Sequence, residues 1–276
     1  MCRWIAYHGE PTVLEDLILK PSHSLVEQSL GARKGATRTN GDGYGIGWYG
    51  MRDEPGIFRE ALPAWNDPNL QSLAQHIVSP LIFAHVRAST GTETTRANCH
   101  PFAHGKWMFM HNGQIGGYEL CRRPLENLLS DELYQVRQGT TDSELFFLLM
   151  VQNGLDEDPV GALRTTVSQI TAVAEDAGAD EPFKLTVCFS DGERLYACRH
   201  SSQGHPPSLY WQMRHGSILV ASEPNDCDQS PWNQVAEDAV LTIGDEVSFE
   251  RLYPVCDTTP KCRIMRLREP AVAAVA

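Results

Sequence analysis

The stretch FKLTVCFSDGERLYACRH, residues 183–200, contains two strand-like runs on either side of an Asp-Gly turn signal. Val, Thr, Phe and Tyr favour strands because their branched or aromatic side chains pack well on a pleated surface. Two such runs joined by a short turn pair antiparallel, since a parallel pair needs a much longer crossover. The stretch therefore predicts an antiparallel hairpin, and antiparallel sheet for this half of the chain.

More strand-like runs surround this hairpin. Those that follow it, most of them separated by short Gly, Asp or Ser turns, are SLYWQM (208–213), SILVAS (217–222), AVLTI (239–243) and EVSFERLYP (246–254). Consecutive strands this close are expected to form antiparallel hairpins. The runs in the first half of the chain are CRWIAYHG (2–9), YGIGWYG (44–50), LIFAHVRAS (81–89) and KWMFMHNG (106–113). Both ends of the chain are thus expected to contribute strands.

The spacing of apolar residues predicts helices over Asp67 to Val78, Thr141 to Met150 and Pro159 to Ala177. Helices kept apart from runs of antiparallel strands describe an α+β layered domain. We expect a single domain over residues 1–276, with a loose tail from about residue 269.

Composition narrows the class of protein. The net charge of −12 argues against nucleic acid as the main partner, which would need clustered Lys and Arg. Eight cysteines occur without a CxxC pair, and the start of the chain lacks the pattern of a secretory signal. No apolar stretch is long enough to span a membrane. We expect a reduced, cytoplasmic protein whose cysteines are mostly buried structural thiols.

Cys2 is the first candidate for chemistry. A thiolate is a strong nucleophile but needs a base near neutral pH. If Met1 is removed, the free α-amine of Cys2, with a reference pKa of about 7.7 to 8.0, supplies that base. The alternative is a small buried side chain with no catalytic role.

Glycines recur at every second position of NGDGYGIGWYG, residues 40–50. The order does not fit a phosphate-binding G-x-G-x-x-G loop. Alternate glycines leave one face of a strand bare, which suits close approach of a ligand or of another backbone. Tight strand packing alone explains the pattern equally well.

HVRAST, residues 85–90, places Arg87 at the end of an apolar run. A guanidinium there can hold a carboxylate through two parallel hydrogen bonds. Taken by itself, a structural ion pair is the stronger explanation of a partly buried arginine.

HNG, residues 111–113, ends another apolar run, and Asn-Gly there is first of all a hairpin turn signal. The functional alternative is an oxyanion hole, in which the Asn112 amide and the Gly113 N–H donate to one developing negative oxygen. TTDSE, residues 140–144, has the spacing of a helix capping box at Thr141 and Glu144. Asp142 is not required by that box, and its carboxylate can pair with an ammonium.

Together these motifs supply a thiol with an amine base, an oxyanion hole, and an Arg and Asp pair that fits the head group of a free amino acid. One mechanism, hydrolysis of a γ-glutamyl amide, uses all of them.

The order Cys2, HVR, HNG and TDSE resembles the class II glutamine amidotransferases, members of the N-terminal nucleophile hydrolases. MCR at the start, PSHSLVEQS, NGDGYGIGWY and NCHPF look closer to a stand-alone branch similar to the ergothioneine-pathway γ-glutamyl hydrolase and the amidotransferase-like component of glutathione degradation. The resemblance implies a four-layer αββα sandwich of two antiparallel sheets between helix layers. It also implies no cofactor or metal.

By the same resemblance Cys2 would be the nucleophile, and Asn112 with Gly113 the oxyanion hole. Arg87 would hold the substrate α-carboxylate and Asp142 its α-ammonium, with Thr90 and His111 as further substrate-binding residues. Ala88 and Gly91 depart from the family's synthases, which carry an aromatic residue and a histidine there.

The predicted activity is release of glutamate and ammonia or an amine from glutamine or a γ-glutamyl compound, through a Cys2 thioester. The chain is expected either to work with a separate partner protein, which would be an ammonia acceptor or a peptidase, or to act alone as a hydrolase. The sequence also allows a homo-oligomer. The main rival is a non-catalytic γ-glutamyl-binding subunit. A zinc hydrolase using Cys99, His100, His104 and His111 is a weaker rival, because their spacing matches no usual zinc motif.

Overall fold

Buried apolar residues lie on both faces of the first half of the first strand, β1 (Arg3–Val13). Trp4 and Ala6 point into one buried apolar cluster, while Ile5 and Tyr7 point into another. Successive side chains of a strand alternate between faces, so β1 must be covered on both sides. The computed structural model describes residues 2–34, 38–89, 91–225, 231–253 and 265–266. In it, β1 lies inside a layered structure.

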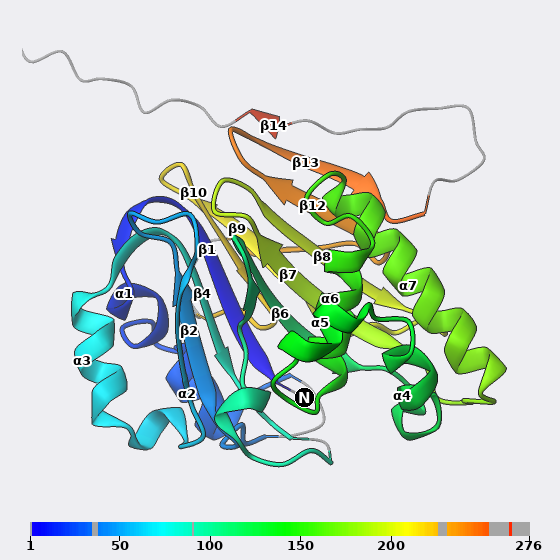
Figure 1. The fold of residues 1–276 in the computed structure, drawn as a ribbon. Coiled ribbons are helices and arrows are strands. Elements are labelled where there is room, and N and C mark those ends of the chain that lie inside the picture. The colour runs from blue at the N-terminus through cyan, green and yellow to red at the C-terminus, as the bar shows by residue number, and fades with distance from the viewer. Residues whose placement is uncertain (1, 35–37, 90, 226–230, 254–264, 267–276) are drawn as a thin grey trace, which may run out of the picture.

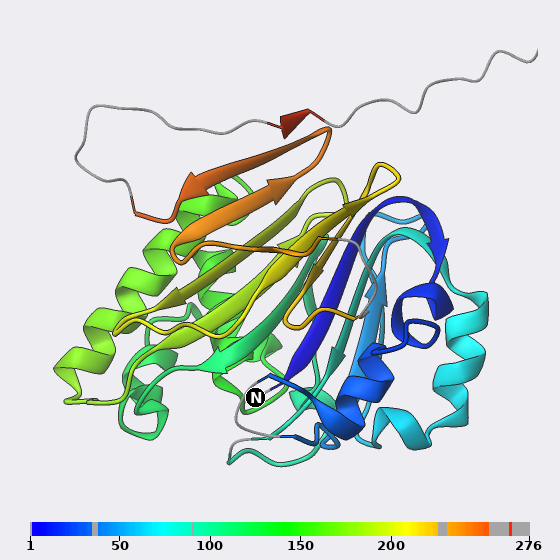
Figure 2. The same ribbon diagram turned by 180° about the vertical axis from the view of Figure 1, so that it is seen from behind.

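The sheet that contains β1 has seven strands in the order β11-β9-β10-β1-β4-β2-β3, with the paired strands antiparallel. The other strands of this sheet are β2 (Tyr44–Trp48), β3 (Gly56–Glu60), β4 (Val78–Val86), β9 (Tyr210–Arg214), β10 (Ser217–Ala221) and β11 (Asn233–Gln234). Its outer face is covered by α1 (Glu15–Ile18), α2 (Leu25–Gly31) and α3 (Pro68–His76). Figure 2 shows β1 in the middle of this sheet.

The second sheet also has seven strands, in the order β14-β13-β12-β8-β7-β6-β5, again with antiparallel pairs. Its strands are β5 (Phe102–His104), β6 (Trp107–Gln114), β7 (Lys184–Ser190), β8 (Leu195–Ser201), β12 (Ala239–Ile243), β13 (Glu246–Arg251) and β14 (Met265–Arg266). The helices on its outer side are α4 (Tyr118–Glu126), α5 (Asp131–Val136), α6 (Asp142–Gln152) and α7 (Pro159–Asp176). Two short 3₁₀ turns, Ala64–Asn66 and Arg96–Asn98, complete the elements.

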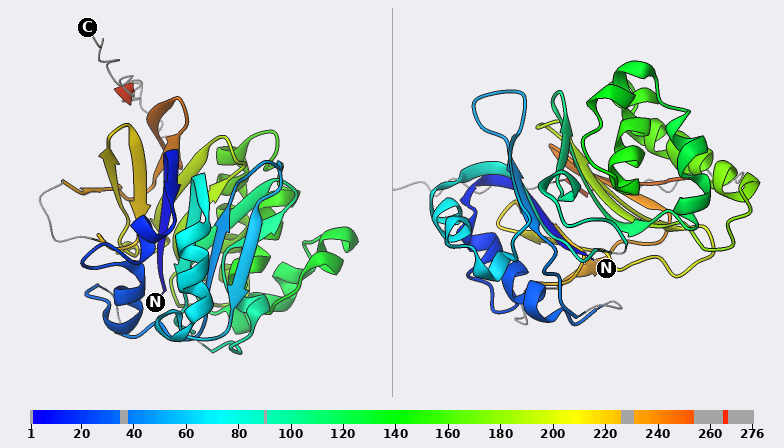
Figure 3. Two further views of the ribbon diagram at one scale, coloured as in Figure 1. Left: turned by 90° about the vertical axis from the view of Figure 1, so that its left-hand side faces the viewer. Right: turned by 60° about the horizontal axis from the view of Figure 1, so that its bottom comes forward.

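Three apolar clusters hold these layers together. One lies between the two sheets and includes Phe83 and Met110, and the other two lie between each sheet and its helices. The view on the right of Figure 3 shows the resulting order of helices, sheet, sheet and helices. The predicted α+β class and the αββα sandwich are therefore confirmed.

The hairpin predicted over residues 183–200 is present as β7 and β8, with Ser190 opposite Leu195. The hairpins β9–β10 and β12–β13 are also present. One expectation was wrong, because β8 and β9 belong to different sheets and the chain crosses between them there.

All three predicted helices match, α3, α6 and α7, to within two residues at each end. Helices α1, α2, α4 and α5 were not predicted. Helix α4 starts after Gly117, whose φ is 62°, with no side-chain cap, and it contains Pro124. The usual signals for a helix start and interior are thus missing from its sequence.

Of the two interpretations of Asn112-Gly113, the hairpin turn is not found. Both residues continue β6, where they lie opposite Thr186 and Leu185 of β7. The predicted bare face of residues 40–50 serves packing between the sheets. A Cβ on Gly45 would lie 2.2 Å from the carbonyl oxygen of His100, and one on Gly47 would lie 2.2 Å from the sulfur of Met108.

Cysteines 2, 99, 121, 188 and 198 are free thiols, and all except Cys2 are buried. The other three cysteines and the tail predicted from about residue 269 lie outside the described residues. Within the described ranges, no helix is long and apolar enough to cross a membrane.

Candidate active site

Cys2 lies beside Ala88 because the strands next to them pair antiparallel. β1 begins at Arg3, β4 ends at Val86, and these two residues lie opposite each other in the ladder. The Ala88 N–H donates to the Cys2 sulfur at 3.4 Å, and the Cys2 thiol lies 3.6 Å from the Ala88 carbonyl oxygen. The start of the central strand is thereby fixed against the segment that carries Arg87.

The facing sheet and its helix layer supply the opposite wall. Asn112 and Gly113 come from the end of β6. Asp142 is the first residue of α6, whose preceding residue, Thr141, caps the helix by accepting a hydrogen bond from the Glu144 N–H. The Glu144 carboxylate accepts from the N–H groups of Gln138 and Gly139. The Thr141 half of the predicted capping box is therefore present, and Glu144 fixes the preceding loop.

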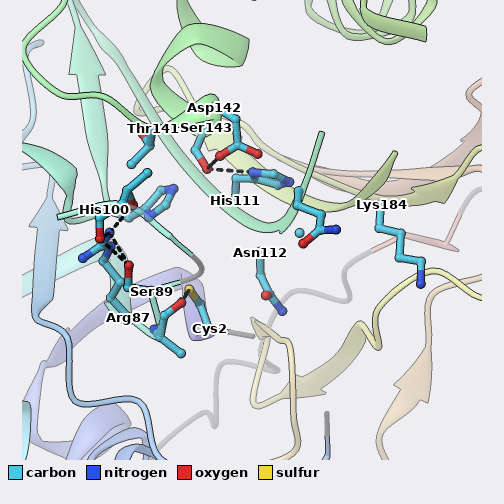
Figure 4. Close-up of a pocket in the computed structure, with 14 residues that line it drawn as sticks. Cys2, Arg87, Ser89, His100, His111, Asn112, Thr141, Asp142, Ser143 and Lys184 are labelled. Atoms are coloured by element: carbon cyan, nitrogen blue, oxygen red, sulfur yellow. Dashed lines mark hydrogen bonds between the residues drawn. The ribbon is translucent and has the colours of Figure 1, made fainter. Parts of the chain in front are cut away.

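These segments enclose a pocket of about 220 Å³, shown in Figure 4. The residues that line it are Cys2, Arg87, Ala88, Ser89, Thr92, His100, His111, Asn112, Gly113, Gln114, Thr141, Asp142, Ser143 and Lys184. Six of the seven predicted site residues thus share one pocket. The seventh, Thr90, lies outside the described residues.

Cys2 is partly exposed as a residue, but its thiol group is shielded from solvent. This burial raises the pKa of the thiol above its usual value, and the hydrogen bond from the Ala88 N–H opposes this rise only in part. A thiol in this environment stays protonated near neutral pH and needs a base to become a nucleophile.

Arg87 is 3% exposed, and its guanidinium is held by neutral groups. It donates to the Asp42 carbonyl oxygen at 3.2 Å, to the Ser89 hydroxyl at 3.2 Å and to the Thr92 hydroxyl at 2.6 Å. Among the described residues no carboxylate pairs with it, so the structural ion pair considered from the sequence is not found. A buried cation without a counter-ion on the wall of a pocket is well placed to bind an anionic group.

Asn112 is 2% exposed, and its side-chain amide makes no hydrogen bond within the described part of the chain. Its backbone oxygen accepts a hydrogen bond from the Thr186 hydroxyl at 3.2 Å, which holds β6 against β7 and does not involve the side-chain amide. Gly113 is required by close approach of the neighbouring strand, because a Cβ there would lie 1.9 Å from the Lys184 carbonyl oxygen.

Asp142 accepts a hydrogen bond from the Ile115 N–H at 2.9 Å, which orients its carboxylate at the pocket wall. The neighbouring Ser143 hydroxyl lies 2.8 Å from Nδ1 of His111. Burial lowers the pKa of His111, while the charge of Asp142 opposes this. The pocket thus has a carboxylate on one wall and the Arg87 guanidinium on another (Figure 4).

Two further buried histidines, His85 and His100, lie near His111, and His100 also lines the pocket. The rings of His85 and His100 lie 4.3 Å apart, and Nε2 of His85 lies 3.3 Å from the His111 carbonyl oxygen. Burial lowers the pKa of His85 to about 3 and that of His100 well below its usual value. The four residues proposed for a zinc site are all described, yet no group of side chains that could hold a metal ion is found in the described ranges.

Comparison with known proteins places this arrangement in a family. Residues 16–225 match the family described as glutamine amidotransferases class-II. The chain belongs to the class-II glutamine amidotransferases. The matched range begins after Cys2, so the predicted nucleophile lies outside it.

Two relatives of this amidotransferase cover most of its length. The probable glutamine amidotransferase DUG3 of Saccharomyces cerevisiae is 32% identical over 93% of this chain and 85% of its own. The γ-glutamyl-hercynylcysteine sulfoxide hydrolase of Mycolicibacterium smegmatis is 28% identical over 89% of this chain and 96% of its own. The family and the enzyme class predicted from the motifs are confirmed.

Solved structures of other proteins are similar to this chain over most of its length. A glutamine aminotransferase class-II domain protein from Silicibacter pomeroyi is 36% identical, with a TM-score of 0.74 over 92% of this chain and 100% of its own. The glutamine phosphoribosylpyrophosphate amidotransferase of Bacillus subtilis is 16% identical, with a TM-score of 0.65 over 91% of this chain and 49% of its own. The second likeness is one of fold alone.

Several lining residues of this amidotransferase were not assigned to the pocket from the sequence. Ser143 lies inside the TDSE motif and could have been included with Asp142. His100 had been considered only as a zinc ligand. Lys184 begins β7 and reaches the pocket because β7 pairs with β6, a contact between distant segments that no local motif reveals.

Proposed function

We propose that this amidotransferase hydrolyses the γ-glutamyl amide bond of glutamine or a γ-glutamyl compound, with Cys2 as the nucleophile after removal of Met1. The observation that carries the proposal is one pocket that holds the Cys2 thiol, the unpaired Arg87 guanidinium and the Asp142 carboxylate. A free amino-acid head group carries the two charges that complement Arg87 and Asp142.

In the first step the Cys2 thiol gives its proton to the free α-amine, and the sulfur attacks the γ-carbonyl carbon. The Asn112 amide and the Gly113 N–H stabilise the negative oxygen that develops. The carbon–nitrogen bond then breaks, and the leaving amine takes its proton from the Cys2 α-ammonium. Because burial raises the pKa of the thiol, a base this close to the sulfur is needed.

In the second step water attacks the γ-glutamyl thioester. The α-amine accepts a proton from that water, the carbon–sulfur bond breaks, and the proton returns to the sulfur as glutamate leaves. The sum is one amide and one water converted into one glutamate and one amine or ammonia. No step requires a metal or a cofactor.

The decisive variant is Cys2→Ala in a protein whose Met1 has been removed. We expect release of glutamate from glutamine or γ-glutamyl amides to fall by a factor of about 10³ or more, because the covalent route is lost. Cys121→Ala, which removes a buried thiol on α4, is the matched control and should retain activity. Equal activity of the Cys2→Ala variant and the unaltered protein would refute the mechanism.

The sequence places Met1 before Cys2, and while Met1 remains, the Cys2 nitrogen belongs to a peptide bond and is no base. Retention of Met1 in the cell would fit a second candidate, a non-catalytic subunit that binds γ-glutamyl groups for a partner enzyme. The intact mass of protein from its native host separates the two, since a retained Met1 would favour the binding subunit.

A further inference from the structure

A second pocket, of about 280 Å³, adjoins the active-site pocket. Asn112 and Lys184 line both, so the two spaces meet beside the proposed oxyanion hole. The second pocket is also lined by Lys34, Tyr210 and a Pro206-Pro207 pair. It is therefore a mixed surface of cations with aromatic and apolar groups.

Lys184 is the cation shared by the two pockets. It begins β7 opposite Gln114, the residue that ends β6, and its side chain is partly buried. Throughout the described ranges no carboxylate pairs with its ammonium group. A cation left without a counter-ion at this junction can bind an anion that enters with the substrate.

Lys34 places a second positive charge on the same pocket. Its ammonium donates to the Tyr210 hydroxyl at 2.9 Å and lies 5.1 Å from the centre of the Tyr210 ring. It too has no carboxylate partner among the residues that the structure describes. Arg3, which also lines this pocket, differs because it is paired with Glu223 at 2.9 Å.

The position of the pocket fits the part of a substrate beyond the γ-carbonyl. In Figure 4, Arg87 and Lys184 lie on opposite sides of Cys2 and Asn112. A substrate whose α-carboxylate is bound by Arg87 and whose γ-carbonyl lies at Cys2 must extend its leaving amine away from Arg87. That direction leads past Asn112 towards Lys184 and the second pocket.

We propose that the second pocket binds a carboxylate on the leaving amine, with Lys184 and Lys34 as the residues that recognise it. The substrate class is then a γ-glutamyl amino acid or short γ-glutamyl peptide with a free carboxylate, in preference to glutamine, whose leaving group is ammonia. This inference rests on the proposed function and names the substrate of that same site.

The test compares two substrates that differ only in this charge, γ-glutamyl-glycine and γ-glutamyl-glycinamide. Glutamate release is measured for both, as kcat/KM, in the unaltered enzyme and in Lys184→Met and Lys34→Met. We expect the unaltered enzyme to prefer the carboxylate substrate by about tenfold or more, the size of one charge-assisted hydrogen bond. Each variant should reduce this ratio, and added salt should reduce it as well.

Lys20→Met is the matched control, because it removes the same charge from an exposed lysine that is already paired with Glu15 and Asp16 on α1. Its ratio should equal that of the unaltered enzyme. A ratio near one in the unaltered enzyme, or a ratio that neither Lys184→Met nor Lys34→Met changes, would refute the proposed carboxylate subsite. It would not refute the proposed hydrolysis of γ-glutamyl amides. Absence of glutamate release from every γ-glutamyl compound, glutamine included, would instead refute the proposed function and the subsite with it.

Discussion

Arg87 is buried, and no carboxylate pairs with it among the described residues. We propose that this combination gives the pocket its selectivity for a substrate carboxylate. Its donors to Asp42, Ser89 and Thr92 hold the guanidinium plane in place. Neutral partners fix its orientation but do not neutralise its charge. A carboxylate that enters the pocket therefore meets a cation that is already oriented, which reduces the ordering cost of binding.

This role predicts the effect of removing the α-carboxylate. We expect the unaltered enzyme to prefer glutamine over its α-carboxamide analogue by about tenfold or more in kcat/KM. Arg87→Met should lose most of that preference, because the interaction with the carboxylate is then absent from both substrates. Arg122→Met, on α4, is the control, since Arg122 pairs with Glu126. An unchanged preference in Arg87→Met would show that another group binds the carboxylate.

The place of several residues in the pocket could be predicted, because local motifs mark them. Cys2, Arg87 and Asp142 each stand at the end of an element that the sequence marks, and the structure brings all three to one pocket. Asn112-Gly113 was ambiguous, because the same dipeptide is typical of hairpin turns. Only the pairing with β7 shows that both residues belong to a strand. Lys184 could not be assigned, since its place depends on that same long-range pairing.

At the scale of elements, β2 matters because its glycines let the two sheets approach closely. Gly45 lies opposite His85 of β4 and faces the His100 carbonyl, at the back of the histidine group that borders the pocket. Side chains on this face would separate the sheets and displace His100 from the pocket wall. The alternate glycines thus contribute to the site by packing and do not contact the pocket themselves.

Gly45→Ala should therefore destabilise the protein by about 1–3 kcal/mol, because the new methyl group would overlap backbone oxygen atoms of His100 and Phe58. Gly50→Ala is the matched control, since a Cβ there meets nothing within 4 Å. Its effect should stay within about 0.5 kcal/mol. Urea unfolding of both variants measures the difference, and equal stabilities would contradict the packing role.

The helices differ in how well local sequence signals predict where they begin. Ser24 caps α2 by accepting a hydrogen bond from the Glu27 N–H at 3.2 Å, so the Ser-x-x-Glu spacing there is a local signal from which α2 could have been predicted. Helix α4 has no comparable signal, because Gly117 precedes it in a left-handed conformation and Pro124 interrupts it. Its position depends on packing beneath the second sheet, where Cys121 and Leu125 join the apolar cluster.

For the whole molecule, the layered fold buries His85, His100 and His111 in neutral form beside the active site. The unfolded chain takes up a proton on His85 below about pH 6.5, whereas the folded protein does not until its pKa of about 3. The stabilising contribution is therefore complete above about pH 6.5 and is lost as the pH falls from there towards 3. The folded state is expected to weaken in mild acid.

Between pH 7.5 and pH 5.5 a single such histidine accounts for about 1.4 kcal/mol of lost stability. His85→Gln should reduce the pH dependence of the unfolding free energy by about that amount, whatever its effect on stability at pH 7.5. The exposed His76, replaced in His76→Gln, is the control and should leave the dependence unchanged. The same slope in His85→Gln and the unaltered protein would show that His85 is not buried in neutral form.

The most direct test of the central claim, that Cys2 is the nucleophile for a γ-glutamyl substrate, is to label the enzyme with a glutamine analogue that carries a diazoketone in place of its amide. Mass spectrometry of the N-terminal peptide then locates the adduct. We predict one label on Cys2 of chains that lack Met1, prevented by excess glutamine or γ-glutamyl-glycine, and none on cysteines 99, 121, 188 and 198. A label on any other residue, or labelling of Cys2 that persists in excess of these substrates, would contradict the account.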